Sequence, residues 1–266
     1  MTIEREVPYS DEYTDRRVMD WFIPVAANHR GMLFIHGGGW SGGDKQSWHE
    51  VAGHYCDLGY TCASAEYRLV PQTDFIGQIT DVRLAMAAFR DRAGQIGFEI
   101  DQIAVVGSSA GGHLVAMLAT LEAADELCTD GPPNGIDTIP NAVICYCPVL
   151  AVYDTGSVRG FFNDAARAML GGTFEDNPQL FRQATPLDRI TGREPPFLFL
   201  HGDADEQVPL SHSTEMHRQL IEAGAISRLV VVPGAPHGFG YGVESAHQKT
   251  SLKHVALFLD TVFTTR

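Results

Sequence analysis

The stretch G-S-S-A-G at residues 107–111 decides the fold that we expect for this chain. It follows an apolar run, I-A-V-V at 103–106, and precedes a helix-like run over 113–121. A G-x-S-x-G pattern between a strand and a helix is typical of a sharp turn that lifts one serine, here Ser109, above the edge of a sheet. Glycine on either side lets the strand and the helix approach closely, where a Cβ would clash. Because chance matches occur in a glycine-rich chain, the rest of the sequence must supply the other parts of the site.

Short apolar runs alternate with amphipathic stretches along the chain. The runs contain few polar positions, as expected of strands that helices cover on both faces. This alternation predicts an α/β fold, with a mostly parallel, doubly wound sheet and helices on both faces. An antiparallel hairpin of residues 7–9 and 17–23 is expected before it. We predict strands at 32–35, 61–65, 103–106, 142–147, 197–200 and 229–232, and helices at 46–58, 76–94, 113–123, 211–223 and 246–261.

The domain organisation is predicted to be simple. A length of 266 residues suits one large α/β domain, and no internal linker or repeat interrupts it, so we expect a single domain over 1–266. Roughly fifty residues separate the strand expected to end at 147 from the strand expected at 197, far more than one crossover needs. Their aromatic-rich part, about 151–190, is predicted to form a small helical lid or pocket wall. A surface excursion with a core of its own is the alternative.

Composition excludes several classes of partner. The formal net charge is −14 and no basic cluster occurs, so nucleic acid and anionic membrane surfaces are not expected to bind. The N-terminus lacks a basic segment followed by an apolar one, and no apolar run approaches the ~20 residues that span a bilayer. We therefore expect a cytoplasmic protein without membrane insertion; its oligomeric state stays open.

The cysteines give no sign of a metal site. They are five, an odd number, and their spacing is not that of metal ligands. Cys145 and Cys147 lie on an apolar run and are expected to be small buried hydrophobes. We therefore predict no metal.

A glycine triplet follows the first predicted strand of the parallel sheet. In H-G-G-G-W at 36–40, successive glycines let backbone N–H groups turn into a cleft and hold a negatively charged oxygen. A phosphate-binding loop is the alternative, but no G-K-[ST] follows the triplet. Trp40 is expected to line the substrate pocket, with a plain packing role as the other possibility. The predicted oxyanion hole consists of the N–H groups of Gly38, Gly39 and Ala110.

An acidic loop leaves the strand predicted at 197–200. Its sequence is H-G-D-A-D-E-Q-V-P at 201–209. A carboxylate is needed there to fix the tautomer of a catalytic imidazole and to stabilise the imidazolium. Asp203 and Asp205 both qualify by type, and Glu206 is a distant third. Asp205 is preferred because the H-G-x-x-D spacing carries it past the strand end, which leaves Asp203 as a turn residue.

A histidine in a glycine- and proline-rich loop completes the predicted site. P-G-A-P-H-G-F at 233–239 follows the last predicted strand and places His237 where a general base is needed. The chain order Ser109, Asp205, His237 is that of the α/β-hydrolases and differs from that of chymotrypsin-like proteins. We therefore predict these residues to be nucleophile, acid and base.

The motifs resemble those of α/β-hydrolase esterases and lipases that carry an H-G-G-G-W loop, over about residues 31–239. E-Y-R-L-V-P at 66–71 is similar to the Y-R-L-x-P stretch of these families, and the resemblance implies a structural pair of Arg68 with Asp81. G-S-S-A-G-G-H-L at 107–114 is more similar to the acetyl-xylan/feruloyl esterase-like branch than to hormone-sensitive-lipase-like enzymes, in which an aspartate stands at the position of Ser108. The glycine loop also resembles that of kynurenine formamidase.

The resemblance implies a carboxylesterase that acts through an acyl-enzyme on a small-molecule ester with a short, acetyl-type acyl group. An acetylated carbohydrate or a plant-derived ester is the first expectation, and no cofactor is implied. An aryl formamide hydrolase of the N-formylkynurenine type would use the same triad, so the sequence does not separate the two. A non-catalytic small-molecule binder of the same fold is a third possibility, although such proteins typically lose the serine or the histidine.

Overall fold

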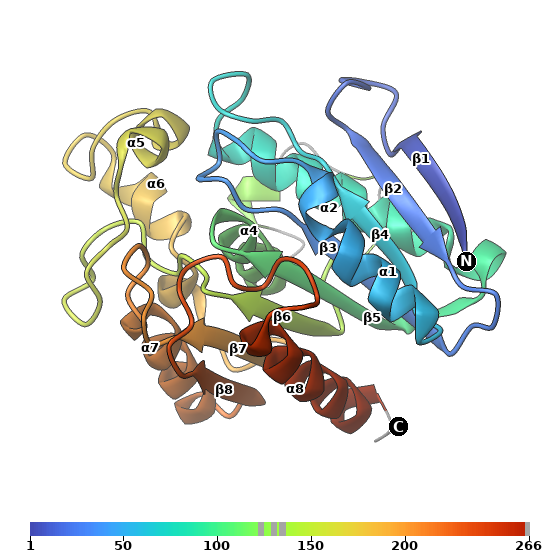
Figure 1. Ribbon diagram of the computed structural model, residues 1–266. Coiled ribbons are helices and arrows are strands. Elements are labelled where there is room, and N and C mark those ends of the chain that lie inside the picture. The colour runs from blue at the N-terminus through green and yellow to red at the C-terminus, as the bar shows by residue number, and fades with distance from the viewer. Residues whose placement is uncertain (122–124, 129–131, 133–136, 264–266) are drawn as a thin grey trace.

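The computed structural model describes residues 1–121, 125–128, 132 and 137–263. In the described residues, eight strands form one sheet in the order β1-β2-β4-β3-β5-β6-β7-β8 (Figure 1). The two pairs at the N-terminal edge, β1 with β2 and β2 with β4, are antiparallel, and the other neighbours are parallel. The predicted mostly parallel sheet and N-terminal hairpin are thus confirmed. The strands are β1 (Thr2–Pro8), β2 (Val18–Ile23), β3 (His29–Ile35), β4 (Thr61–Ala65), β5 (Phe98–Ser108), β6 (Ala142–Tyr146), β7 (Phe197–Gly202) and β8 (Ser227–Val232).

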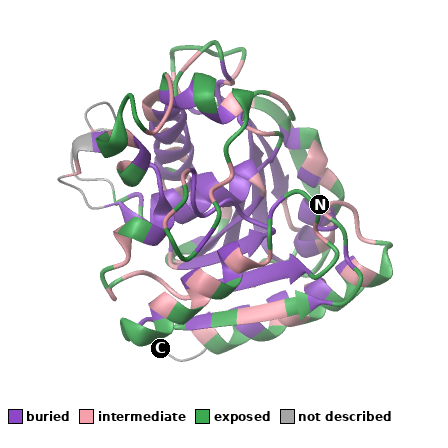
Figure 2. Ribbon diagram, turned by 90° about the vertical axis from the view of Figure 1, so that its left-hand side faces the viewer, coloured by how far each residue is buried: buried purple, intermediate pink, exposed green. Residues whose placement is uncertain are grey.

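Helices cover both faces of this sheet. On one face lie α1 (His49–Asp57) and α8 (Ala246–Phe263), and on the other lie α2 (Phe75–Asp91), α4 (Ala110–Thr120) and α7 (Ser211–Glu222) (Figure 1). Successive residues of a strand point to opposite faces. In β3, Met32 and Phe34 therefore join the α1–α8 side, whereas Leu33 and Ile35 join the other. This double burial explains why the central strands read as continuous apolar runs (Figure 2).

Several element bounds close to the predicted site differ from the predicted ones. Strands β5 and β7 extend to Ser108 and Gly202, two residues past their predicted ends. Strand β6 ends at Tyr146, one residue earlier than predicted, because Cys147 adopts a positive φ of 38° that a strand does not contain. Helix α4 begins at Ala110, three residues earlier than predicted, directly after Ser109. Between α2 and β5 the structure adds a short helix, α3 (Ala93–Ile96), which the sequence did not predict.

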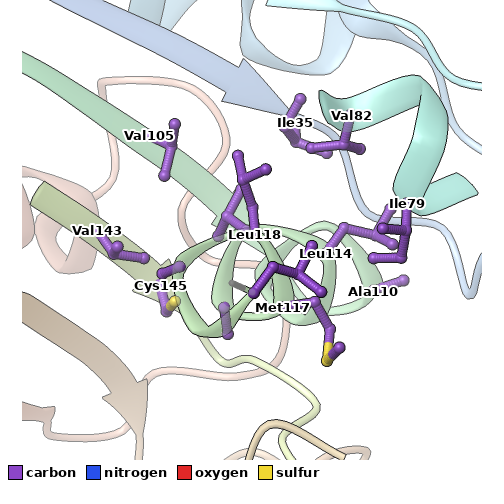
Figure 3. Packing of buried hydrophobic residues seen from close by; sticks show 14 of the residues in the cluster. Ile35, Ile79, Val82, Val105, Ala110, Leu114, Met117, Leu118, Val143 and Cys145 are labelled. Atoms are coloured by element: carbon purple, nitrogen blue, oxygen red, sulfur yellow. The ribbon is translucent and has the colours of Figure 1, made fainter. Parts of the chain in front are cut away.

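Helix α4 is the most deeply buried helix near the site, with every residue from Ala110 to Thr120 inside the protein. Leu114 and Leu118 pack between the sheet and α2, where Ile79 and Val82 meet them (Figure 3). Full burial of one such side chain contributes roughly 1.5–3 kcal/mol to stability. The helix that follows Ser109 is therefore anchored over its whole length.

The segment after β6 contains the helices α5 (Asp164–Leu170) and α6 (Pro178–Gln183) and a 3₁₀ turn at Pro186–Arg189. Asn163 and Asn177 cap the two helices by accepting hydrogen bonds from Ala166 N and Leu180 N. The buried side chains of the segment belong to the same cluster as those of α4, so among the described residues it has no separate core. A lid or pocket wall at about 151–190 stays a prediction.

Within the described part of the chain, every helix is too short or too polar to cross a lipid bilayer.

Candidate active site

Ser109 occupies a strained turn between β5 and α4. Its φ of 55° and ψ of −117° lie where a residue with a side chain rarely stands, at a cost of about 1–3 kcal/mol. Hydrogen bonds hold it there, since Ser109 N donates to Tyr146 O at 2.9 Å and His113 N donates to Ser109 O at 3.0 Å. A Cβ on Gly107 would collide with the backbone of Gly111, and one on Gly111 would collide with the strand end at Ile35. Both glycines of the G-x-S-x-G pattern are therefore required by packing.

The three residues predicted as a triad lie in one hydrogen-bonded row. His237 Nε2 is 2.9 Å from Ser109 Oγ, and His237 Nδ1 is 2.7 Å from Asp205 Oδ2. Because a carboxylate only accepts, Nδ1 donates its proton to Asp205, and Nε2 is left to accept from the serine hydroxyl. The Asp205 side chain is fully buried, and that of His237 is 13% exposed. Residues from three separate loops thus meet at the carboxyl ends of β5, β7 and β8.

The two candidate aspartates have different surroundings. Asp205 accepts backbone hydrogen bonds from Gln207 N and Val208 N through Oδ1, both at 2.9 Å, and its Oδ2 faces His237. Burial raises the pKa of Asp205, but hydrogen bonds from His201, His237 and Val208 N outweigh burial and hold that pKa well below its usual range. Asp203 is exposed and accepts from Gly234 N at 2.6 Å, which ties the loop after β7 to the loop after β8. Asp205, not Asp203, faces the imidazole.

Two features of the surroundings of His237 shift the pKa of its imidazole in opposite directions. Burial lowers the pKa of the imidazole, whereas hydrogen bonds with Asp205 and with the thiol of Cys147 raise it, and the net direction is upward. A raised pKa means that the imidazole readily takes a proton from a neighbouring hydroxyl. It also means that, as the pH falls, His237 is protonated at a higher pH than an ordinary histidine.

Cys147 is a member of this site that the sequence did not reveal. Its side chain is fully buried next to His237, and its Sγ is 3.7 Å from Ser108 Oγ. The apolar run predicted a residue inside a strand, but Cys147 stands after the end of β6 with its N–H bonded to Leu200 O at 2.9 Å. Its left-handed backbone and its contact with His237 distinguish it from a packing cysteine, and no sequence pattern signals either.

The glycine loop after β3 curls beside Ser109. Gly38 and Gly39 have φ of 113° and 60°, and the loop closes on itself through Gly42 N, which donates to Gly38 O at 2.9 Å. A Cβ on Gly37 would lie 3.4 Å from the Cβ of Ser109, so the loop packs directly on the serine. Ala110 is the first residue of α4, where an N–H has no partner inside the helix. The predicted donors of the oxyanion hole therefore lie on two segments that adjoin Ser109.

Trp40 has no exposed surface, and its indole links three segments. Trp40 Nε1 donates to His113 Nδ1 at 3.1 Å, and His113 Nε2 donates to Ala184 O at 2.8 Å. Burial lowers the pKa of His113 to about 4, so the ring is neutral and keeps the tautomer that accepts from the indole. The ring of Trp40 also lies 6.0 Å from that of Phe161. These contacts fit the packing role of Trp40 better than direct contact with a substrate.

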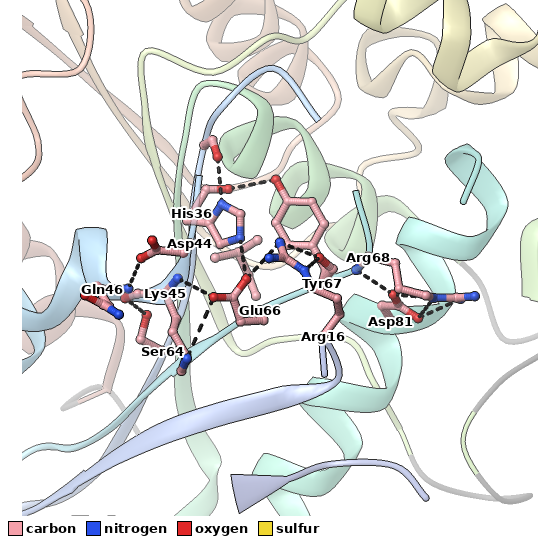
Figure 4. Close-up of polar contacts among 12 residues, drawn as sticks. Arg16, His36, Asp44, Lys45, Gln46, Ser64, Glu66, Tyr67, Arg68 and Asp81 are labelled. Carbon is pink, nitrogen blue, oxygen red and sulfur yellow. Dashed lines mark hydrogen bonds and ion pairs between the residues drawn. The ribbon is translucent and has the colours of Figure 1, made fainter. Parts of the chain in front are cut away.

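A buried polar cluster supports the glycine loop from below (Figure 4). His36 Nδ1 donates to Gly37 O at 2.7 Å, and the ring of Tyr67 stacks on that of His36 at 4.4 Å. Glu66 lies 3.5 Å from His36 Nε2 and 2.9 Å from a guanidinium nitrogen of Arg16. A hydrogen bond thus ties His36 to the glycine loop, and the carboxylate beside its ring is paired with Arg16 from the turn of the N-terminal hairpin.

The pair of Arg68 and Asp81 that the resemblance implied is confirmed. Arg68 Nη2 lies 2.8 Å from Asp81 Oδ1, and Arg68 N donates to Asp81 Oδ2 at 2.9 Å. Arg17 makes a second contact of 2.7 Å with the same carboxylate, whose side chain is fully buried. Two arginines, one just before β2 and one just after β4, thus compensate a buried charge on α2.

Tyr241 is a second contact that the sequence did not reveal. It lies four residues after His237, and its hydroxyl accepts the N–H of Gly37 at 2.8 Å. Its ring packs 4.7 Å from that of Trp48 and holds the hydroxyl in place. The loop that carries the predicted base thereby holds the first glycine of the loop predicted to bind the oxyanion.

We expect Tyr241→Phe to lower kcat for an ester substrate about 10-fold and to change KM by less than about 3-fold. The substitution leaves the Gly37 N–H without its partner and frees the start of the glycine loop, which affects the charged intermediate more than the neutral substrate. Steady-state kinetics of purified variants measure the split.

The control is Tyr60→Phe, which removes a half-buried hydroxyl bonded to Arg30. That variant should keep the wild-type kcat. An increase in KM at unchanged kcat for Tyr241→Phe would contradict a positioning role.

Known proteins share sequence similarity with this chain over most of its length. Residues 19–220 match the family described as BD-FAE. Esterase LipC from Mycobacterium tuberculosis is 33% identical over 245 residues, which make up 88% of this chain and 59% of LipC. An acetylxylan esterase from Xylanibacter ruminicola is 22% identical over 244 residues, 91% of this chain and 47% of that protein. This chain therefore spans about half the length of these curated relatives.

Solved structures share the fold at low sequence identity. The native structure of Est2, an esterase from Thermogutta terrifontis, superposes with a TM-score of 0.81 at 22% identity, over 98% of this chain and 92% of Est2. Est2 has also been solved with propionate and with butyrate. The family match extends over most of the chain and includes Ser109 and Asp205. The chain therefore belongs to the BD-FAE family and has the α/β-hydrolase fold of the esterases to which it is similar.

Proposed function

We propose that this protein hydrolyses carboxylic esters through an acyl-enzyme formed on Ser109. The observation that carries the proposal is the continuous row from Ser109 Oγ to His237 Nε2 at 2.9 Å and from His237 Nδ1 to Asp205 Oδ2 at 2.7 Å. A serine hydroxyl is a poor nucleophile at neutral pH and needs an adjacent base, and the base needs a group that orients it. Here His237 is in hydrogen-bond contact with both Ser109 and Asp205.

In the first half-reaction, His237 Nε2 takes the proton of Ser109 as Oγ attacks the ester carbonyl. The oxygen of the tetrahedral intermediate is held by the N–H groups of Gly38, Gly39 and Ala110, and one such donor is worth about 2.7–4 kcal/mol in the transition state. His237 then gives its proton to the leaving alkoxide, and the acyl group stays on Ser109. Asp205 stays ionised throughout and stabilises the imidazolium.

In the second half-reaction, water takes the place of the alcohol. His237 removes a proton from the water, the resulting oxygen attacks the acyl carbon, and the carboxylic acid leaves as the proton returns to Ser109. These steps need only the protein groups named, so we propose hydrolysis without a cofactor.

We infer a short acyl group for the preferred substrate. Among similar proteins, Est2 has been solved with propionate and butyrate, and the relative from Xylanibacter ruminicola is an acetylxylan esterase. Acetylated carbohydrate is therefore the first natural ester to test.

A panel of 4-nitrophenyl esters tests the acyl preference. We expect kcat/KM for the acetate and butyrate to exceed that for the octanoate at least about 10-fold, since each CH₂ that stays in water forfeits about 0.8 kcal/mol of burial. Acetylated xylan and N-formylkynurenine complete the panel. A kcat/KM that rises up to the octanoate would overturn the short-acyl proposal, and faster turnover of N-formylkynurenine than of any ester would favour the formamide hydrolase.

A further inference from the structure

Three side chains at the proposed active site offer three kinds of ligand atom to one small volume. Cys147 Sγ, a carboxylate oxygen of Asp205 and an imidazole nitrogen of His237 all lie within 4.8 Å of one another. Thiolate, imidazole and carboxylate are the donors that Zn²⁺ accepts in proteins, and thiolate also attracts softer ions such as Cd²⁺. The hydrolysis proposed above makes no use of the thiol.

We propose that Cys147, Asp205 and His237 form a binding site for a thiophilic divalent cation, and that occupation of this site switches hydrolysis off. Binding of the ion is independent of the reaction, whereas the inhibition rests on the proposed function. The ion is an inhibitor here and takes no part in ester hydrolysis.

The geometry requires only a small adjustment. Around tetrahedral Zn²⁺, with bonds of about 2.0–2.3 Å, neighbouring donor atoms are about 3.3–3.6 Å apart. The three donors, now up to 4.8 Å apart, must therefore close by about 1 Å. Asp205 and His237 stand on loops after β7 and β8, and small shifts of these loops can supply this movement. The fourth position is left to a water molecule or to the hydroxyl of Ser109.

Features around the thiol resemble those that support a metal ligand. The left-handed backbone of Cys147 and its N–H bond to Leu200 O fix the position of the side chain. Oδ1 of Asp205 is already held by two backbone N–H groups, which leaves Oδ2 to face the ion. Such outer contacts orient ligands and strengthen metal binding. Two anionic donors, the carboxylate and the deprotonated thiol, would balance the charge of a divalent ion in a buried place.

Inhibition follows directly from coordination. The thiol releases its proton to solvent when the ion binds. An imidazole nitrogen that donates its lone pair to the ion is lost to the proton relay. If Nε2 is used, Ser109 has no base, and if Nδ1 is used, the contact with Asp205 that sets the tautomer is replaced. The exposed edge of His237, 13% of its side chain, gives the ion a path from solvent.

The functional test is a titration of 4-nitrophenyl acetate turnover with Zn²⁺, using the wild type, Cys147→Ser and Cys145→Ser. Each rate is expressed relative to that variant without metal. We expect the wild type to be inhibited and to recover with a chelator, and Cys147→Ser to need at least about 10-fold more Zn²⁺. Cys145 is equally buried but contacts Gly112 O, so Cys145→Ser should respond as the wild type does. Equal inhibition of Cys147→Ser and wild type would overturn the proposal.

A binding measurement separates failure of this site from failure of the proposed function. Cd²⁺ bound to a thiolate gives an ultraviolet charge-transfer band, so titration with Cd²⁺ reports the bond to sulfur without any substrate. We expect about one equivalent of Cd²⁺ to produce the band in the wild type and in Cys145→Ser, and no band in folded Cys147→Ser, as judged by thermal unfolding. An inactive wild type that still shows the band would refute the esterase and keep the site. A wild type without the band, whether active or not, would refute the site.

Discussion

Ser109→Ala is expected to lower kcat for 4-nitrophenyl acetate by about 10⁴–10⁶-fold, because the residues of a triad act as a unit and lose activity together. Removal of one oxygen leaves His237 and Asp205 in contact with each other but with no nucleophile to activate. The residual rate would come from the oxyanion hole and substrate binding, which together retain about 10³–10⁴-fold over water in related systems. Initial rates measure the loss of kcat, and stopped-flow measurements show whether a burst of nitrophenol, the sign of an acyl-enzyme, is lost as well.

The matched control is Ser108→Ala, which removes a hydroxyl from the neighbouring, fully buried residue. Ser108 Oγ is 3.7 Å from Cys147 Sγ and is not part of the hydrogen-bonded row of Ser109, His237 and Asp205. This variant should therefore keep a burst, and its kcat should stay within about 10-fold of the wild-type value. If Ser109→Ala kept more than a tenth of wild-type activity, Ser109 would not be the nucleophile.

The central strands of the sheet could be predicted from the sequence because burial on both faces leaves a simple pattern. A strand covered on both faces must be apolar at every position, and 32–35, 103–106 and 197–200 are. The helices could be placed because four of the five predicted ones fill the interval between two predicted strands and the fifth follows the last strand. The exact start of α4 could not, because it depends on Ser109 leaving helical geometry, which only the packed backbone around Gly107 and Gly111 enforces.

Some residues of the site could likewise be predicted from local motifs, and others could not. Ser109, Asp205 and His237 each follow a strand, and the carboxyl ends of parallel strands meet at one edge of the sheet. Motif spacing was therefore sufficient to predict that these three residues lie together. Cys147 and Tyr241 enter the site through features that no local pattern carries. One is a positive φ after β6, and the other is a hydroxyl that reaches across to Gly37, more than two hundred residues earlier in the chain.

Asp205→Asn is expected to lower kcat by about 10⁴-fold. An asparagine can keep the shape of the site and the hydrogen bonds from Gln207 N and Val208 N, but its amide can present a donor to Nδ1 and favour the wrong tautomer of His237. The carboxylate also raises the pKa of His237, and the base must be neutral to act. In the wild type, kcat/KM should therefore fall with acid around a midpoint above the ordinary histidine value of about 6.5, and in Asp205→Asn that midpoint should move down.

Asp203→Asn is the control for Asp205→Asn, because both aspartates stand on the loop after β7 and the sequence alone offers both as candidates for the acid of the triad. Asp203 accepts only the N–H of Gly234 among its described contacts, and an asparagine oxygen can accept the same bond, so kcat and the pH midpoint should stay close to those of the wild type. If Asp203→Asn lost activity and Asp205→Asn kept it, the acid of the triad would be misassigned. If both kept it, His237 would be oriented without a carboxylate, and the pH profile of the double variant would show whether its pKa had returned to the ordinary value.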